Sequence, residues 1–421
     1  MQTTIHYPKL RFGKKYVDIF PYWVGLLILG VLFGLVGVFF VLRDGLQVTG
    51  LSNKVPWGLW ISIDLSSISL GGSAFAFGVI VYLLRLERFE IVGKLAVLLG
   101  FLGYSTAGLV LLMDLGQPFR FWHPVVYWQA HSLLWEITMC VVLYLTVLMC
   151  ELVPIIVELP FFESHPWHEK YPIVKKIVDF SKIASHWLHK AGPALAVIGL
   201  SLSLLHQASL GATYSVLYGR GVWFNQSAPT QFVFSAMSGG IALLFFLSVF
   251  VFRVMRPGLV KDDVLYDVAR IAGGITLLLT YLRLWDWAVT NYYSFDRNIN
   301  LQTEALNAIA PYSMGFWLGQ ALFPVIAGSI LVAAKSVKNF RYLMAASVIP
   351  IFAAILTRWN YNFAGLIAHS TYDPYTPIIR VNSYTPTWVE FAVGTLVISY
   401  WLLAFSFAAR YLPFQGKHRE P

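Results

Sequence analysis

Long apolar runs alternate with short polar connections along almost the whole chain. Each run has about 20 or more mostly apolar residues, which is enough for a helix to cross a hydrocarbon core of about 30 Å. The pattern predicts ten spans, at residues 20–42, 56–84, 94–113, 133–158, 191–218, 230–252, 264–290, 312–334, 342–362 and 386–409. We therefore expect an all-α fold, a polytopic transmembrane helix bundle in which residues 1–421 form a single integral membrane domain.

Basic residues predict the orientation of this bundle. The connections on the side of the two termini, together with the termini themselves, hold 22 of the 30 lysines and arginines; six lie on the other side, and Arg283 and Arg358 lie inside spans. Cytoplasmic loops carry such an excess of Lys and Arg. The sequence therefore predicts cytoplasmic N- and C-termini in a cytoplasmic (inner) membrane. The net charge of +9 follows from this topology and gives no reason to expect a nucleic-acid partner.

Two further patterns concern the organisation of the bundle. Residues 171–190 place apolar side chains on one helical face and lysines on the other, which is typical of an amphipathic helix on the inner leaflet, with a partner-docking helix as the alternative. Gly71-Gly72 precedes Arg85 by the same spacing that separates Gly239-Gly240 from Arg253. This repeat predicts two four-helix bundles, spans 2–5 and 6–9, with spans 1 and 10 added.

Composition changes this picture little. The chain is 57% hydrophobic and 12% charged, more apolar than a soluble core can absorb. Its two cysteines, Cys140 and Cys150, lie ten residues apart in one span, so they form neither a CxxC-type site nor a disulfide. We expect no metal site and no iron–sulfur cluster bound by this chain.

Polar and ionisable side chains inside the spans gather toward the extracytoplasmic side. The candidates are Asp64, Asp114, Glu136, His206, Gln207, Arg283, Asp286 and Arg358. A charge in lipid is expensive, so such residues face the bundle interior and mark functional sites by default. Simpler explanations stay open. Arg283 and Asp286 can neutralise each other, Arg358 can snorkel to the surface, Asp114 can belong to a turn, Glu136 can be half solvated, and His206 can be a packing residue.

A quinone head group needs the chemistry that this layer offers. It requires hydrogen bonds to two carbonyl oxygens, a proton donor or acceptor, and an apolar slot. Asp64, Glu136 and His206 are the candidates for handling protons, and Glu151 and Tyr281 are the candidates for a proton path from the inner side. Haem is disfavoured because a b-type site normally takes two axial ligands and His206 is the only histidine well inside a span. Electrons are therefore expected to come from a partner.

The motifs PWGLWISIDLSSISLGG (56–72), DLGQPFRFWHP (114–124), WEITMCVVLYLTVLMCE (135–151) and LLHQASLG (204–211) together resemble the NrfD/polysulfide reductase family. The chain is similar above all to its ten-helix branch, which holds the hydrogenase-2 (HybB) and sulfite-reduction-associated (DsrP) membrane subunits. The resemblance implies a haem-free subunit that exchanges electrons between menaquinone or ubiquinone and an extracytoplasmic ferredoxin-like iron–sulfur subunit, with possible proton translocation. It also implies a quinone pocket among spans 2, 3 and 4, with Asp64 and Glu136 at polar pocket positions.

Two other classes of protein fit the pattern. A secondary transporter would have buried charge and glycine-broken helices too, although its charges usually lie near the midplane. A membrane anchor without its own quinone site would need the buried acids for assembly alone.

Gln117 replaces the arginine that some relatives carry in the DLGRP motif, so the resemblance implies no ionic role for that position.

Overall fold

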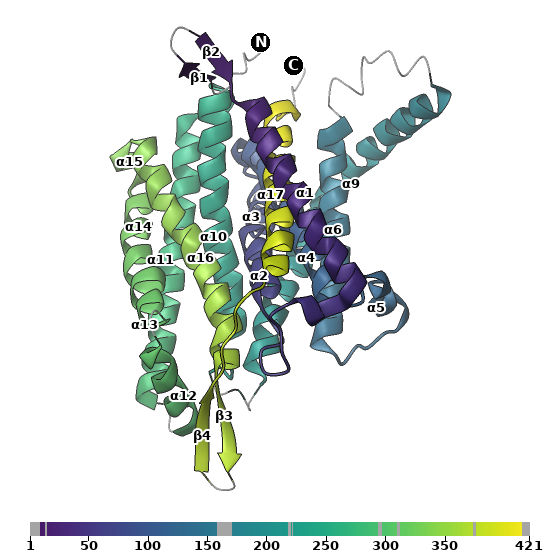
Figure 1. The fold of residues 1–421 in the computed structure, drawn as a ribbon. Coiled ribbons are helices and arrows are strands. Elements are labelled where there is room, and N and C mark those ends of the chain that lie inside the picture. Colours follow the sequence, from purple (N-terminus) through teal and green to yellow (C-terminus); the bar gives the residue numbers. More distant parts are fainter. Residues whose placement is uncertain are drawn as a thin grey trace.

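The computed structural model of the chain describes residues 9–12, 15–157, 171–217, 220, 222–293, 297–309, 312–373 and 376–414. Long helices lying side by side make up the body of the molecule (Figure 1). In these described ranges, ten helical segments are long and apolar enough to cross a membrane. They run Phe20–Val48, Leu59–Val81, Glu87–Asp114, Leu133–Val157, Lys190–Ser215, Ala228–Met255, Asp262–Tyr292, Tyr312–Val332, Phe340–Ile367 and Trp388–Tyr411. The predicted ten-span helical bundle is confirmed.

Several spans are assembled from more than one helical element. The first half of the chain contains α1 (Phe20–Asp44), η1 (Gly45–Val48), α2 (Leu59–Leu70), α3 (Ser73–Gly78), η2 (Val79–Leu83), η3 (Glu87–Phe89), α4 (Glu90–Asp114), η4 (Pro118–Arg120), α5 (His123–Val126), α6 (Leu133–Val157) and α9 (Pro172–Ser215). The second half contains α10 (Ala228–Val249), η5 (Phe250–Met255), α11 (Asp262–Tyr293), α12 (Arg297–Ala308), α13 (Tyr312–Met314), η6 (Gly315–Leu322), α14 (Phe323–Val332), α15 (Ala334–Val337), α16 (Phe340–Ile367) and α17 (Trp388–Tyr411).

Several predicted boundaries moved, and two of the shifts have a clear physical reason. The third span begins at Glu87 rather than at residue 94, with Glu87 and Glu90 in first helical turns, where the helix dipole favours acids. The ninth span continues to Ile367 rather than stopping at 362, because the polar residues of its last turns are buried and hydrogen-bonded inside the bundle. The segment expected at 171–190 is helical from Pro172 but is no separate helix, since α9 runs on without a break into the fifth span.

The two halves of the bundle cross at their glycine pairs. A Cβ atom on Gly72 would lie 2.5 Å from the backbone oxygen of Ala236, and one on Gly240 would lie 2.6 Å from the backbone nitrogen of Ser73. Only glycine allows the backbones of α2–α3 and α10 to approach so closely. Both helices then continue into a π-helical turn, η2 and η5. This crossing is consistent with a repeat of spans 2–5 in spans 6–9, which stays a prediction.

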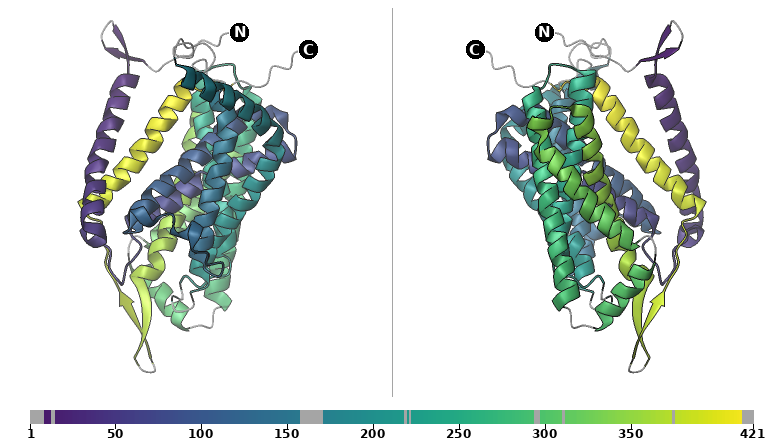
Figure 2. Two further views of the ribbon diagram at one scale, coloured as in Figure 1. Left: turned by 90° about the vertical axis from the view of Figure 1, so that its right-hand side faces the viewer. Right: turned by 90° about the vertical axis from the view of Figure 1, so that its left-hand side faces the viewer.

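The first and last spans form a pair of their own at one side of the bundle (Figure 2). Asp18 and Arg410 form an ion pair of 3.4 Å at the end where α1 begins and α17 ends. At the other end, Glu390 of α17 accepts a hydrogen bond of 2.7 Å from the backbone nitrogen of Gly50, and its own backbone oxygen accepts one of 3.0 Å from Trp60 of α2. These contacts attach the added pair to the core helices.

Two small hairpins accompany the helices and were not predicted. β1 (Lys9–Phe12) pairs antiparallel with β2 (Lys15–Asp18), and β3 (Ala368–Asp373) pairs antiparallel with β4 (Thr376–Val381). The β3–β4 hairpin projects beyond the helices at the end opposite to the start of α1 (Figure 1). We call these two ends of the bundle the hairpin end and the termini end.

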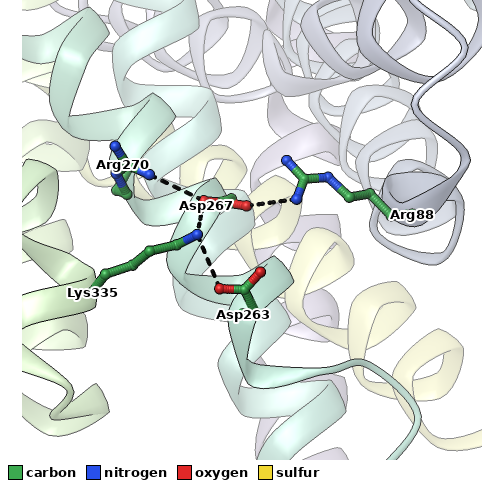
Figure 3. A network of polar contacts seen from close by, with 5 residues as sticks. All are labelled: Arg88, Asp263, Asp267, Arg270 and Lys335. Atoms are coloured by element: carbon green, nitrogen blue, oxygen red, sulfur yellow. Dashed lines mark hydrogen bonds and ion pairs between the residues drawn. The ribbon is translucent and has the colours of Figure 1, made fainter.

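A network of ion pairs lies at the termini end (Figure 3). Asp267 of α11 accepts from Arg88 at 2.9 Å, from Lys335 at 2.9 Å and from Arg270 at 3.4 Å, and Lys335 also reaches Asp263 at 3.0 Å. Arg88 comes from η3 and Lys335 from α15. The network therefore joins the start of the third span to the seventh span and to α15 at this end.

Candidate functional site

Asp64 lies inside the protein, on α2 near the hairpin end. Its side chain is 4% exposed, and its Oδ1 atom has no hydrogen-bond partner among the described residues. The neighbouring serines donate no hydrogen bond to Asp64. Ser62, Ser66 and Ser67 donate instead to the carbonyl oxygens four residues earlier in their own helix. The helix thus holds a buried acid without a neutralising contact partner.

Arg358 of α16 carries a positive charge in the same part of the bundle. It is fully buried, so it is not the snorkelling residue that the sequence left open. Its Nη2 atom donates to Gln207 Oε1 at 2.9 Å and to the backbone oxygen of Phe232 at 2.7 Å, and its guanidinium lies 3.8 Å from the Phe232 ring centre. Its Nε and Nη1 atoms have no partner among the described residues. A buried guanidinium with two unused donors is typical of a site that binds oxygen atoms.

His206 and Gln207 of α9 belong to the same layer. Gln207 bridges two elements, since its Nε2 atom donates to the backbone oxygen of Ile68 at 3.3 Å while its Oε1 atom accepts from Arg358. His206 is fully buried beside Tyr104, with ring centres 5.5 Å apart. Neither ring nitrogen of His206 has a hydrogen-bond partner in the described ranges. Buried polar atoms normally have partners, so an imidazole in this state is available to a ligand or water.

Glu136 and Asp114 stand at the margin of the layer. Glu136 of α6 is partly buried and accepts a hydrogen bond of 2.7 Å from Ser209 of α9. Asp114 ends α4, and its Oδ1 atom is buried without a partner among the described residues. Gly116, two residues later, has a positive φ of 67°, so the turn suggested by the sequence is present. That turn does not use the buried Asp114 oxygen.

Sequence reasoning missed Asn362, which joins α16 to α2. Its Nδ2 atom donates to the backbone oxygen of Gly58 at 3.3 Å and to Ser62 Oγ at 3.0 Å, and its Oδ1 atom accepts from Tyr214 at 3.3 Å. One turn earlier, Trp359 donates to Ser66 Oγ at 3.2 Å. The sequence carried a signal for this residue, because amide side chains at the end of an apolar span need buried partners.

Arg283 and Asp286 do not neutralise each other. Arg283 is 2% exposed and donates to Thr357 Oγ1 and, at 3.5 Å, to the backbone oxygen of Gln320. Asp286 accepts from Asn225 Nδ2 at 2.9 Å and from Ser227 Oγ at 2.6 Å. Among the described residues, no ion pair joins the two.

Arg283 and Asp286 both line a cavity of about 780 Å³. It lies between α10, α11, α12, η6 and α16, and its lining does not include Asp64, Glu136, His206 or Arg358. Thr357, which Arg283 contacts, directly precedes Arg358 in α16. The predicted single layer is therefore divided into two regions that adjoin at α16, the Asp64 layer and the Arg283 cavity.

Two other sequence candidates have clear positions. Tyr281 is 63% exposed on the apolar outer surface of α11, so it does not line an interior path. Glu151 lies two turns before the end of α6 and is partly buried. In the described part of the chain, no group of three His, Cys, Asp or Glu side chains is arranged to hold a metal ion.

Comparison with known proteins gives one family. The family model described as "Polysulphide reductase, NrfD" matches residues 47–368. The menaquinone reductase integral membrane subunit of Nitratidesulfovibrio vulgaris is 30% identical over 95% of this chain and 93% of its own length. The probable Ni/Fe-hydrogenase 2 b-type cytochrome subunit of Escherichia coli is 24% identical over 87% of this chain and 85% of its own. The Hdr-like menaquinol oxidoreductase integral membrane subunit of Archaeoglobus fulgidus is 20% identical over 93% of each chain.

Proposed function

The chain belongs to the NrfD polysulphide reductase family, and we propose that it is the quinone-reactive membrane subunit of a multi-subunit respiratory oxidoreductase. In this proposal it exchanges electrons between membrane menaquinone or ubiquinone and an extracytoplasmic iron–sulfur subunit. The name of the menaquinone reductase relative, which spans nearly the whole chain, supports the quinone assignment. The observation that carries the proposal is the buried Asp64 layer, in which an acid, an arginine and an imidazole all keep unpartnered polar atoms.

Each residue of the layer has a role that its contacts allow. Arg358 and His206 have donors or acceptors free for the oxygen atoms of a quinone head group. Asp64 holds or releases a proton at its unpartnered Oδ1 atom. Gln207 positions Arg358 through their hydrogen bond of 2.9 Å. Glu136 and Asp114, at the margin, are the groups through which protons leave or enter the layer.

The overall step balances without a redox group in this chain. Reducing a quinone to a quinol takes two electrons and two protons, and the reverse reaction releases both. The electrons pass to or from the partner's iron–sulfur centre, while Asp64 exchanges protons through the hairpin end. That end is the extracytoplasmic side if the positive-inside prediction holds. Proton translocation would need a further path from the termini end, for which Glu151 is the remaining candidate.

Haem is not part of this proposal, although one relative is named as a b-type cytochrome subunit. A b-type haem normally needs two axial ligands. Among the histidines that the structure describes, only His206 lies within a candidate span. The side chains of the described spans therefore do not fit a bis-histidine haem.

The decisive experiment is Asp64→Asn in the intact complex. We expect quinol-linked turnover to fall at least tenfold, with weaker inhibition by quinone-site inhibitors, while the complex still assembles. Asp179→Asn is the matched control, because it makes the same change at an exposed position of α9. Unchanged turnover and unchanged inhibitor sensitivity in Asp64→Asn would contradict the assignment.

Copurification separates the proposal from its rivals. An iron–sulfur chromophore that travels with the chain supports the oxidoreductase subunit, whereas substrate counterflow by the isolated chain in vesicles supports a secondary transporter. For an anchor without a quinone site, Asp64→Asn would lower the amount of assembled complex and leave the turnover of each assembled complex unchanged.

A further inference from the structure

The Arg283 cavity is separate from the Asp64 layer, and the proposed function does not use it. Its volume of about 780 Å³ falls within the range of about 300–1,000 Å³ that is usual for small-molecule sites. Its walls come from the sixth to the ninth spans, together with α12. The cavity is therefore large enough for a ring-sized head group.

The buried cation in its wall lacks an anion. Arg283 is 2% exposed, and its hydrogen bonds go to a hydroxyl and a backbone carbonyl. Its Nε atom is buried without a partner in the described ranges. A buried charge of this kind is costly unless further hydrogen bonds complete its surroundings. Arg283 also lines the cavity, and its Nη1 atom has only a long hydrogen bond of 3.5 Å, so a ligand oxygen in the cavity can accept from the guanidinium.

A carboxylate, Asp286, lies one helical turn away from Arg283 on α11. Asp286 also lines the cavity, and Asn225 and Ser227 hold its two carboxylate oxygens at 2.9 and 2.6 Å. Each of these oxygens can accept one more hydrogen bond. The cavity thus presents a donor and an acceptor from the same face of α11. A phosphate group would satisfy Arg283 but would be repelled by Asp286.

The remaining walls suit a flat ring. Trp285, Trp287, Phe316 and Trp317 line the cavity, and the rings of Trp287 and Trp317 meet edge to face at 4.9 Å. A quinol or quinone ring has an oxygen at each end, and in either form one oxygen can accept from Arg283. The opposite hydroxyl of a quinol can also donate to Asp286, a contact that the quinone form lacks. Aromatic walls with a few placed polar groups are the usual composition of such sites.

The predicted internal repeat places the cavity and the first site in different halves of the chain. The glycine pairs cross between the second and sixth spans, and their equal spacing along the chain predicts that the sixth to ninth spans repeat the second to fifth. The Asp64 layer belongs mainly to the first set of four spans and the Arg283 cavity to the second set. One class of ligand can therefore occupy both halves of the internal repeat.

We propose that the Arg283 cavity is a second quinone-binding site, which holds the head group between Arg283 and Asp286 and exchanges it with the membrane. This inference rests on the proposed function, because it takes the ligand class from it. The second site binds and releases quinone; the oxidation and reduction stay at the Asp64 layer.

Photolabelling of the purified intact complex tests the proposal. The probe is an azido-naphthoquinone with a short isoprenoid tail, and labelled peptides are identified by mass spectrometry. We expect label in the cavity-lining segments 282–291 or 312–320 in addition to label near Asp64. An excess of the same naphthoquinone without the azide should remove both labels.

Variants show whether the cavity itself is responsible. In Arg283→Met we expect cavity labelling to fall at least tenfold, with Arg283→Lys between the variant and the wild type, and labelling near Asp64 to persist. Ser313→Phe places a larger side chain on another wall of the cavity and should have the same effect without altering Arg283. In Asp64→Asn we expect labelling near Asp64 to fall and cavity labelling to persist. Failure of the first site and failure of the second site are therefore distinguishable.

Three results would overturn the inference. The first is label confined to the first half of the chain at saturating probe. The second is cavity label that phosphatidylglycerol removes and naphthoquinone does not, which would assign the cavity to a phospholipid. The third is unchanged cavity labelling in Ser313→Phe, a readout that remains if Arg283→Met fails to assemble.

Discussion

Charged side chains around Asp267 and around Asp64 lie at opposite ends of the same bundle, and they are accommodated differently. At the termini end, Asp267 meets three cations, whose side chains are 41–51% exposed. At the hairpin end, Asp64, Arg283 and Arg358 are at most 4% exposed, and none of them has an ion pair among the described residues. The charges of the first set are paired within the protein and partly hydrated. The charges of the second set are neither paired nor hydrated.

This difference separates two uses of charge. An ion-pair network at the surface holds elements together, and water and salt weaken it. A buried charge without a counter-ion contributes nothing favourable to folding by itself, because its desolvation is costly. Under the proposed function, a ligand completes the surroundings of these residues. The comparison therefore predicts that changes at the hairpin end affect ligand chemistry and changes at the termini end affect assembly.

The largest effect is expected from Arg358→Met in the intact complex. The variant removes the donor for the quinone oxygen and leaves the acceptors on Gln207 and Phe232 unused. We expect a loss of about 3 kcal/mol in transition-state stabilisation, which corresponds to about a hundredfold in quinol-linked turnover per assembled complex. Steady-state kinetics with a soluble naphthoquinol measures it.

Arg358→Lys sharpens that result. A lysine keeps the positive charge but cannot reproduce the planar donors of the guanidinium. Turnover between those of Arg358→Met and the wild type would show that both charge and geometry contribute. If Arg358→Met lowered the yield of complex while turnover per complex stayed the same, Arg358 would be a structural residue like those at the termini end.

An intermediate effect, of a different kind, is expected from Asp267→Asn. The change leaves Arg88, Arg270 and Lys335 around a neutral amide. Because these cations are about half exposed, we expect a loss of about 1–2 kcal/mol in stability rather than the larger cost of a fully buried pair. Thermal unfolding in detergent should show a lower midpoint and a weaker dependence on salt.

The control for Asp267→Asn is turnover. Per assembled complex, turnover should equal that of the wild type, since the network lies at the other end of the helices from the Asp64 layer. A large loss of turnover without loss of stability would break the division between the two ends.

The smallest effect concerns Lys335 and pH. Hydrogen bonds from Lys335 to Asp267 and then Asp263 raise its pKa above the usual value. A raised folded pKa means that the stabilisation is fully present below the unfolded value of about 10.4 and is lost as pH rises through the folded pKa. We expect Lys335→Gln to lower the unfolding midpoint slightly at pH 8 and to show a smaller further decrease above pH 10.4 than the wild type. An equal alkaline decrease in both proteins would contradict this role.

Much of the fold could be predicted from the chain alone. The lengths of the apolar runs predicted all ten spans, whereas the two related halves suggested by the glycine spacing stay a prediction. Asp64 was predicted to be buried, because a carboxylate in the middle of small residues on an apolar helix has no route to water. The hairpin of β3 and β4 was missed, because a short pair of strands gives little periodic signal beside long helices.

The candidate site could be predicted only in part. The sequence favoured one polar layer, and three-residue spacing suggested that Arg283 and Asp286 neutralise each other. In the structure, Thr357 and Gln320 from other helices bind Arg283, while Asn225 and Ser227 bind Asp286. Spacing along one helix describes neighbours on that helix and cannot describe competing partners on the next one.

The sequence by itself determined which segments are helical spans and where along its span each ionisable group stands, because the cost of placing polar groups in lipid acts on every segment separately. Only the tertiary structure decided which groups meet. Helix rotation and packing bring Gln207 to Arg358 and direct Arg283 toward a different cavity from Asp64. Those contacts depend on how several helices pack at once, which no single span encodes.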